Sequence, residues 1–304
     1  MKNKGNGENS EENNKSDDSD DSNNNNDNLQ CAPGKENKPY TCYKTETLIK
    51  MRENWNSRHP DLKIETDEPK KIWENLKINM EDVCENESCW LRQKFMENSV
   101  NNELMNYTFA PKSPKSWSKN PNEWLSSLDI ERVMKQYEKE YKNFDFIGPS
   151  PIDFDTHILN NECVWEELCK FSLKKHLTRG KQKIGIIFNT DPHYKDGSHW
   201  ISLFINIQKN NNYIFFFDSN GDKVPKEIKK LCDRILEEGK TELGIENFKF
   251  YENSKTHQKS NTECGMYSLY LIIELLTENH TIDHFMNTWV KDATVESFRK
   301  KYFN

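Results

Sequence analysis

A cysteine stands at the start of the most apolar stretch of the chain, in the segment HQKSNTECGMYSLYLIIELL (residues 257–276). A structural thiol would be expected inside the apolar run, but Cys264 precedes it and follows a polar loop. The unpaired N–H groups and the dipole of a helix N-terminus favour a thiolate. The position therefore indicates that Cys264 is a nucleophile.

A cysteine nucleophile needs a base that takes its proton and a third group that orients the base. His199 begins a strand-like segment in GSHWISLFINI, and alternation places it on the face opposite Trp200. Asp218 ends the next strand-like segment, NYIFFFD. A turn at 208–211 joins the two segments, so a hairpin brings His199 and Asp218 within cross-strand reach.

Taken singly, each of these residues also has an ordinary structural interpretation. An Asp in DSNG is commonly a turn residue, and a His at a strand end is commonly a surface group. Free cysteines are often buried and inert. His257, in the same loop as Cys264, is a rival base, but we expect it to be exposed to solvent. The joint arrangement of His199, Asp218 and Cys264 favours catalysis.

The elements that must position these residues indicate an α+β fold, with a mixed sheet flanked by helices. FIGPSPIDFD is interpreted as a Gly/Pro loop. The segment PKEIKKLCDRILEEG predicts a helix with Pro225 as its first residue and Gly239 just past its end. The other expected helices are 129–144, opened by Asp129, then 163–177 and the segment after Cys264, and the expected strands are 183–189, 199–207, 212–218 and 248–253.

The chain of 304 residues divides into three parts. Its first 30 residues hold three Lys, eight Asp or Glu, ten Asn and no aromatic residue, and residues 1–38 are interpreted as a disordered acidic tail. Helical spacing in ETLIKMRENW, PKKIWENLKINMEDV and CWLRQKFMENSVNNELM predicts a small helical accessory region at 39–115. The prolines of APKSPKSWSKNP mark a boundary, and residues 116–304 form the core.

Charge and hydropathy argue against a nucleic-acid-binding protein and against a membrane protein. The first 30 residues supply −5 of the formal net charge of −7, and the near-neutral remainder gives no electrostatic argument for nucleic-acid binding. Without a run of 18 apolar residues or a signal peptide, we expect a soluble intracellular protein with no membrane partner.

The eight cysteines form no compact framework, and free thiols are expected in a reducing compartment. A structural zinc site is an alternative for four of them, with His59 as a substitute ligand, although no tight CxxC pair is present. These cysteines are Cys31, Cys42, Cys84 and Cys89.

Three sequence motifs around these residues resemble those of a known protein family. GSHW, FFDSNG and QKSNTECG, in that order, resemble the Ulp1-like cysteine proteases, which include ubiquitin-like-protein proteases and the adenovirus maturation protease. In that family His is followed by Trp, and Gln precedes Cys by six residues, as do His199 and Gln258 here. WLSSLDIERV, FNTDPHYKDGSHW and FIGPSPIDFD resemble the branch of large double-stranded DNA viruses, typified by the African swine fever virus polyprotein protease. The resemblance covers residues 122–304. Viral members often have Asn where this chain has Asp218.

The resemblance implies an Ulp1-like core with the nucleophile at the N-terminus of a central helix. It assigns Cys264 as nucleophile, His199 as base and acid, Asp218 as its orienter and Gln258 as an oxyanion donor. It requires no cofactor and no catalytic metal.

Three further residues are expected to contact or enclose the substrate. Gly265 is expected to let substrate approach the helix end. Trp200 is expected to shield the His–Asp pair or to serve as a core aromatic residue. Trp124 or the FIGPSP loop is expected at the lip of a narrow tunnel that accepts Gly-Gly.

The first expectation for function is a viral endopeptidase that cuts structural polyproteins after Gly-Gly-X during particle assembly, in the host cytoplasm or inside the virion. The second is deconjugation of a host ubiquitin-like modifier such as SUMO. An acetyltransferase with the same residue order and an inactive scaffold are further alternatives. No coenzyme site is apparent, and the complete set of four catalytic residues argues against the scaffold.

Overall fold

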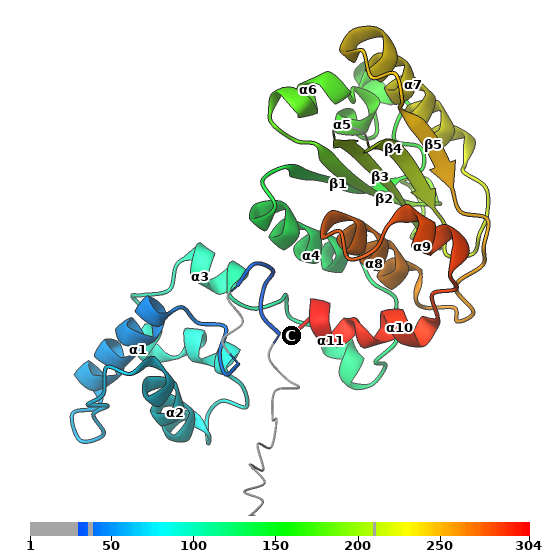
Figure 1. Cartoon of the computed structure of the whole chain (residues 1–304). Coiled ribbons are helices and arrows are strands. Elements are labelled where there is room, and N and C mark those ends of the chain that lie inside the picture. Colours follow the sequence, from blue (N-terminus) through cyan, green and yellow to red (C-terminus); the bar gives the residue numbers. More distant parts are fainter. Residues whose placement is uncertain (1–29, 36–38, 209–210) are drawn as a thin grey trace, which may run out of the picture.

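The computed structural model describes residues 30–35, 39–208 and 211–304. The chain forms a helical region at its N-terminal side and a larger part built around one sheet (Figure 1). Among the described residues, no helix is long and apolar enough to cross a membrane. Most of the expected acidic tail, residues 1–29, lies outside the described part of the chain.

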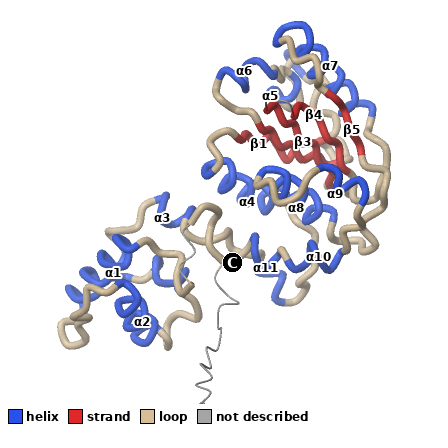
Figure 2. The backbone as a smooth tube through the Cα atoms, viewed as in Figure 1, coloured by secondary structure: helices blue, strands red, loops and turns tan. Residues whose placement is uncertain are grey.

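The sheet has five strands in the order β1-β2-β3-β4-β5, and Figure 2 shows the strands in red. β2 (Lys183–Asn189), β3 (Trp200–Gln208) and β4 (Asn211–Phe217) form an antiparallel meander. β1 (Phe144–Pro151) pairs parallel to β2, and β5 (Lys249–Glu252) pairs parallel to β4. The predicted mixed sheet is confirmed.

Successive side chains along these strands point to opposite faces of the sheet, and each face forms a separate apolar layer with the helices that cover it. The helices α4 (Ser127–Glu140) and α8 (Cys264–Leu276) pack on one face, which carries Phe204 and Phe215. The helix α7 (Lys226–Leu243) packs on the other face, which carries Leu203 and Phe216. The short helices α5 (Glu166–Cys169) and α6 (Leu173–Thr178) lie on the α7 side (Figure 1). α9 (Ile282–Asn287), α10 (Asp292–Ser297) and α11 (Arg299–Tyr302) follow α8.

The helix α8 is enclosed on all sides, because each of its residues is buried. It lies between the sheet and the helices α4 and α10. An all-round apolar sequence such as MYSLYLIIELL is what such a position requires. The end that carries Cys264 is thereby fixed in place.

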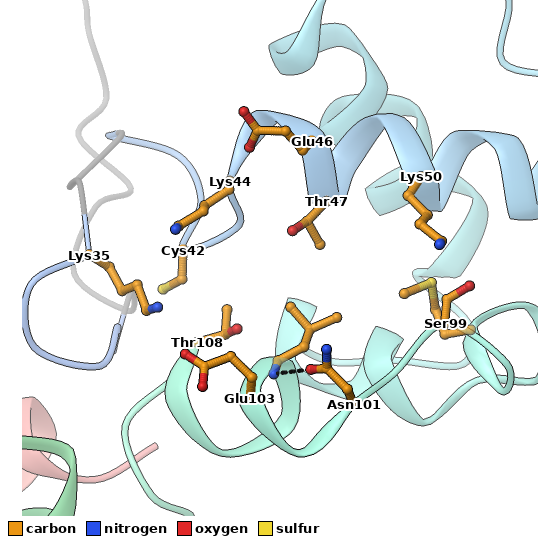
Figure 3. A pocket seen from close by; sticks show the side chains of 12 residues that line it. Lys35, Cys42, Lys44, Glu46, Thr47, Lys50, Ser99, Asn101, Glu103 and Thr108 are labelled. Atoms are coloured by element: carbon orange, nitrogen blue, oxygen red, sulfur yellow. Dashed lines mark hydrogen bonds between the residues drawn. The ribbon is translucent and has the colours of Figure 1, made fainter. Parts of the chain in front are cut away.

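The N-terminal helical region is present and has its own apolar core. It contains α1 (Thr45–Arg58), α2 (Pro69–Met80), two 3₁₀ turns (Glu87–Arg92 and Lys94–Met96) and α3 (Asn102–Tyr107). A third 3₁₀ turn, Lys115–Ser118, leads into the core. A cavity of 350 Å³ lies between α1 and the segment that carries α3, and Lys44, Lys50 and Glu103 are among its lining residues (Figure 3).

Two groups of hydrogen bonds join this region to the core. The side-chain amide of Gln136 on α4 donates to the carbonyl oxygens of Asn106 (2.6 Å) and Phe109 (2.9 Å). The backbone of Asn304 donates to Pro111 O and accepts from Ser113 N, both at 2.8 Å. The segment between the two parts is therefore held by the last residue of the chain.

Five sequence-based expectations about the elements and the tail are wrong. The segment expected to be a Gly/Pro loop contributes β1, which bulges between Ile147 and Ser150. The predicted helix 163–177 is split into α5 and α6. α7 continues to a left-handed cap at Gly244 (φ 65°), and Gly239 is interior because the Phe248 ring packs against it.

The other two errors concern an N-cap and the tail. Ser126 caps α4, and Asp129, the third residue of the helix, completes a capping box with it. The predicted tail 1–38 extends too far, because the backbone at 30–32 bonds to residues 108–110. Cys31 is also disulfide-bonded to Cys42.

The expectation of free thiols is also wrong. The structure forms the disulfides Cys31–Cys42, Cys84–Cys89 and Cys163–Cys169, and leaves Cys232 and Cys264 free. The four cysteines weighed as zinc ligands are thus paired with one another, and His59 instead stacks on the Trp55 ring.

Candidate active site

The structure brings His199 and Asp218 together as predicted. The residue His199 immediately precedes β3 and Asp218 immediately follows β4. In this hairpin Ser202 lies opposite Phe217. His199 and Asp218 therefore approach each other diagonally at the end of the two strands. The Nε2 atom of His199 is 2.8 Å from Oδ1 of Asp218.

Asp218 is held on three sides. Its backbone N–H donates to Asn253 Oδ1 (2.9 Å), and its carbonyl accepts from Asn253 Nδ2 (2.8 Å). Its Oδ1 also accepts from the Asn220 N–H (2.8 Å). Asn253, which directly follows β5, is 2% exposed, so this clamp is shielded from water. Sequence reasoning missed Asn253, because its contact joins two segments that lie 35 residues apart in the chain.

The imidazole of His199 interacts with both Asp218 and the thiol of Cys264. Burial alone lowers the pKa of His199, but the hydrogen bonds and charges of Asp218 and Cys264 outweigh it and raise this pKa to about 10. Because Nε2 is engaged by Asp218, Nδ1 is the ring nitrogen left for the cysteine. The site therefore favours an imidazolium next to the sulfur.

Cys264 is the first residue of α8 and is 2% exposed. The residue before it, Glu263, is fully buried, and its carboxylate accepts from the guanidinium of Arg299 on α11 at 3.0–3.1 Å. Burial raises the pKa of Glu263, and the charge of Arg299 opposes that shift. This ion pair, which sequence reasoning missed, ties the start of α8 to the C-terminal segment.

The side chain of Gln258 has a fixed orientation. Its Oε1 accepts from Ser219 Oγ at 2.8 Å, and its Nε2 donates to the Ser260 carbonyl at 2.7 Å. An amide nitrogen carries two hydrogens, so one N–H remains available. The backbone N–H of Gln258 also donates to the Ser219 carbonyl at 3.0 Å.

The expectation that His257 is solvent-exposed is wrong. Its side chain is fully buried, Nε2 lies 2.9 Å from Phe285 O, and Nδ1 accepts from Val290 N at 3.1 Å. These partners specify the tautomer with the proton on Nε2, and burial lowers the pKa of His257. With both ring nitrogens engaged, His257 has a structural role and is not a rival base.

The three residues expected at the substrate occupy different places. The indole N–H of Trp200 donates to Leu125 O (3.0 Å), and its ring packs on the core, so one wall of the site is joined to the segment before α4. A Cβ on Gly265 would lie 3.0 Å from Leu125 Cβ and 3.2 Å from Trp200 Cδ1, so its lack of a side chain serves packing. Trp124 is 43% exposed. Contact of these three residues with substrate stays a prediction.

Together these groups can perform acyl transfer. A thiol at a helix N-terminus interacts with an imidazole, the imidazole bonds to a carboxylate, and the Gln258 amide lies in the loop before the helix. This is the arrangement of a cysteine nucleophile with its base, orienter and oxyanion donor.

Residues 130–304 match the Ulp1 protease family, C-terminal catalytic domain. The chain belongs to the Ulp1 protease family. The protein is therefore a cysteine protease, and the α+β fold with an N-terminal helical region agrees with this assignment.

Relatives of this Ulp1-family protease occur in large DNA viruses. It is 30% identical over 270 residues to a protein of Acanthamoeba polyphaga mimivirus that is named as a thiol protease, covering 88% of this chain and 85% of that one. It is 27% identical over 192 residues to one protein from each of two African swine fever virus isolates, covering 59% of this chain and 67% of each relative. One of these two proteins is named a cysteine protease and the other a SUMO-1 cysteine protease.

The crystal structure of a protease of African swine fever virus has a similar fold. The match has a TM-score of 0.61 at 19% identity, and it covers 90% of this chain and 95% of that chain. Because the match extends over most of both chains, it includes the N-terminal helical region of this protease as well as the sheet.

Proposed function

We propose that this protease cleaves peptide bonds through Cys264, with His199 as base and acid, Asp218 as orienter and Gln258 as oxyanion donor. The observation that supports this assignment is His199 held between Asp218, at 2.8 Å, and the thiol of Cys264. The thiolate attacks the scissile carbonyl, His199 protonates the leaving amine, and water hydrolyses the thioester. The free amide N–H of Gln258 stabilises the oxyanion.

We further propose Gly-Gly-type sites as the cleavage specificity. The support is the burial of the nucleophile: Cys264 is 2% exposed, and the packed Trp200 and Leu125 adjoin Gly265. A bond that reaches this sulfur must come from a segment without bulky side chains beside it. The physiological substrate then is a viral structural polyprotein cut during virion maturation.

A second candidate is deconjugation of a SUMO-like modifier. It is favoured by one relative at 27% identity that is named a SUMO-1 cysteine protease. The two candidates share one catalytic site and differ in what must be recognised outside it.

Three reagents test both proposals on the full chain. A Gly-Gly-X peptide and a folded SUMO precursor are compared as substrates, and a modifier–vinyl-sulfone probe is used for labelling. We expect cleavage of the peptide and an adduct on Cys264 in the mass spectrum. Turnover of the folded modifier alone would favour the second candidate.

Variants test the assignment of the residues. Cys264→Ser and His199→Gln are each expected to lower cleavage by about 10⁴-fold or more. His284→Gln is the matched control, because it changes a partly exposed histidine of α9 that does not contact the site, and it should leave cleavage unchanged. Wild-type activity in Cys264→Ser would overturn the assignment of the nucleophile.

A further inference from the structure

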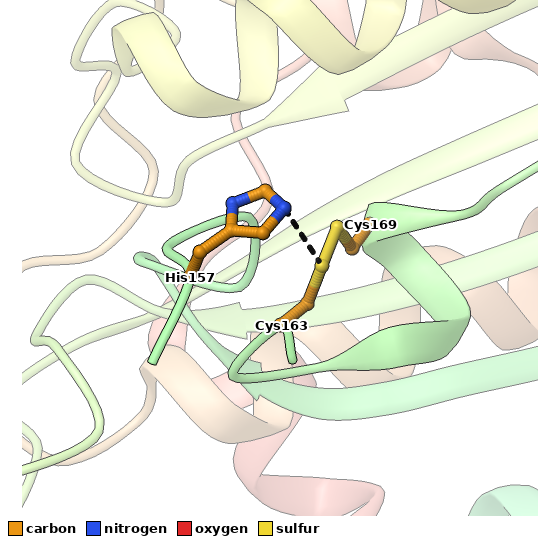
Figure 4. Close-up of side chains that lie close together, drawn as sticks. All are labelled: His157, Cys163 and Cys169. Carbon is orange, nitrogen blue, oxygen red and sulfur yellow. Dashed lines mark hydrogen bonds between the residues drawn. A yellow bond between two sulfur atoms is a disulfide. The ribbon is translucent and has the colours of Figure 1, made fainter. Parts of the chain in front are cut away.

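Three metal-binding side chains converge in the loop between β1 and α6, at a distance from the cysteine site in sequence. The side chains are His157, Cys163 and Cys169, and their ligand atoms all lie within 4.8 Å of one another (Figure 4). Cys163 and Cys169 form a disulfide, and Nε2 of His157 is 3.8 Å from the sulfur of Cys163. The proposed protease mechanism uses none of them.

The backbone itself brings the three residues together. His157 and Cys163 are partners in an isolated antiparallel bridge, so their side chains are neighbours on one face of a small hairpin. Hydrogen bonds on either side of the bridge fix its register: Val164 N to Thr156 O (2.9 Å) and Ile158 N to Glu162 O (2.8 Å). Cys169 ends the short helix α5 that follows. The convergence therefore does not depend on the disulfide alone.

Of the three disulfides in the described residues, this one alone has a third metal-binding side chain beside it. The pairs Cys31–Cys42 and Cys84–Cys89 lie elsewhere, in the N-terminal helical region. Here Cys163 is buried, Cys169 is partly exposed and His157 is exposed. A metal ion and a small reductant can thus approach from the His157 side.

The spacing of the three residues suits Zn²⁺. Tetrahedral zinc with Zn–S near 2.3 Å and Zn–N near 2.0–2.1 Å places sulfur and nitrogen about 3.6 Å apart and two sulfurs about 3.8 Å apart. The observed 3.8 Å between His157 Nε2 and Cys163 Sγ is close to the first value. The Cα atoms of Cys163 and Cys169 are 6.2 Å apart, so rotation of the side chains can separate the sulfurs.

We propose that His157, Cys163 and Cys169 form a zinc site that is filled when the disulfide is reduced. Two thiol molecules of the glutathione type reduce the disulfide to two Cys thiols and become one disulfide themselves. Zn²⁺ then binds both thiolates and the neutral imidazole, and the two thiol protons are released. Water completes the tetrahedron on the exposed side. Disulfide and zinc are thus alternative cross-links of the same loop.

The test uses the full chain with Cys264→Ser, so that the site thiolate cannot hold metal. The protein is reduced with a phosphine, loaded with Zn²⁺ and passed over a desalting column with a weak chelator, and zinc per chain is measured by mass spectrometry. We expect one zinc per reduced chain and none per oxidised chain. Co²⁺ in place of Zn²⁺ should give the absorption bands of a tetrahedral thiolate complex.

Three further variants locate the metal. Cys163→Ser/Cys169→Ser should lose it, and the matched pair Cys84→Ser/Cys89→Ser should keep it. His157→Gln should weaken affinity by at least about tenfold, because even partners outside the coordination sphere are worth that much. His157 is exposed, so this change leaves the fold intact and covers the case in which the double variant fails to fold. Zinc bound with unchanged affinity in His157→Gln, zinc lost from the Cys84/Cys89 variant, or no zinc on the reduced chain would each overturn the proposal.

Discussion

The proton on His199 is the residue-scale feature with the clearest measurable effect. Its pKa is raised from 6.5 to about 10, because the hydrogen bonds and charges of Asp218 and Cys264 outweigh its burial. We expect kcat/KM for a short peptide to stay high through neutral pH and to fall as pH rises through about 10, because His199 then loses the proton that the leaving amine needs. A pH–rate profile measures this. A fall already complete near pH 7 would contradict it.

The same shift affects stability with a defined sign. The folded-state pKa lies above the unfolded value, so the stabilising contribution of His199 is fully present below pH 6.5 and is lost as pH rises through about 10. The difference in Tm between wild type and His199→Gln is therefore expected to shrink between pH 6 and pH 10.

Ser219 is expected to act on catalysis through Gln258. Gln258→Ala should lower kcat by roughly 10²–10³ with little change in KM, which is the result of losing one oxyanion donor. Ser219→Ala should lower kcat by a smaller factor, because the amide keeps its bond to the Ser260 carbonyl but loses the one that fixes its oxygen. The double variant should be no worse than Gln258→Ala alone. Additive losses would mean that Ser219 acts independently of Gln258.

At this scale the sequence was most informative about the proposed catalytic groups. Strand alternation predicted the contact between His199 and Asp218, which the structure shows. Motif spacing pointed to Gln258 and Cys264, whose catalytic roles stay predictions. Asn253 and Arg299 could not be found, because their contacts join segments 35 and 36 residues apart and no local pattern records such a contact. His257 was misjudged for the same reason: its partners lie in the later segment 285–290.

At the scale of elements, the N-terminus of α8 depends on α11. Glu263 and Arg299 are buried as an ion pair, and the guanidinium also lies over the Trp117 ring at 4.6 Å. Arg299→Met should lower the free energy of unfolding by about 3–5 kcal/mol, because it leaves the Glu263 carboxylate buried without its partner. Denaturant unfolding measures the loss, and Glu263→Gln/Arg299→Met should recover part of it. A loss below about 1 kcal/mol, or no recovery, would show that the pair does not stabilise this end of the helix.

The sequence predicted the regular strands well. It failed where a glycine or proline inside an element was interpreted as a loop or as the end of a helix. The predicted bounds of β2, β3 and β4 agree with the structure to within one residue, and α8 begins at Cys264 as expected. β1 was missed because Gly148 and Pro149 resemble a loop, although here they form the bulge in its pairing with β2. In α7 the first glycine was taken as the end of the helix, but tertiary packing of Phe248 explains that glycine.

At the scale of the whole molecule, the neighbours of the proposed catalytic groups, such as Phe217 and Met266, and the N-terminal helices belong to different apolar cores. Removing residues 1–115 is expected to leave the four catalytic residues in place, since all are positioned by β3, β4, α8 and their loops. We expect cleavage of a short Gly-Gly-X peptide to be retained, with a larger loss on a full-length substrate and lower solubility. Gln136 loses both of its acceptors in this truncation, which exposes part of α4.

The test compares kcat/KM of the full chain and of the truncated chain, each on the short peptide and on the full-length substrate. Removal of residues 1–29 alone is the control and should change neither peptide cleavage nor Tm. Equal losses on the peptide and the full-length substrate would show that the helical region shapes the active site itself.

The pairing of the cysteines allows the number of active protease molecules in a preparation to be measured by thiol labelling. All eight cysteines lie in the described part of the chain, and six of them are in disulfides. Of the remaining two, Cys232 is fully buried in α7, and burial raises its pKa to about 12. We therefore expect Cys264, next to His199, to be the one reactive thiol of the oxidised chain. A small alkylating reagent added without reductant should consume one equivalent per competent molecule, so the mass of adduct gives the fraction of a preparation that can turn over.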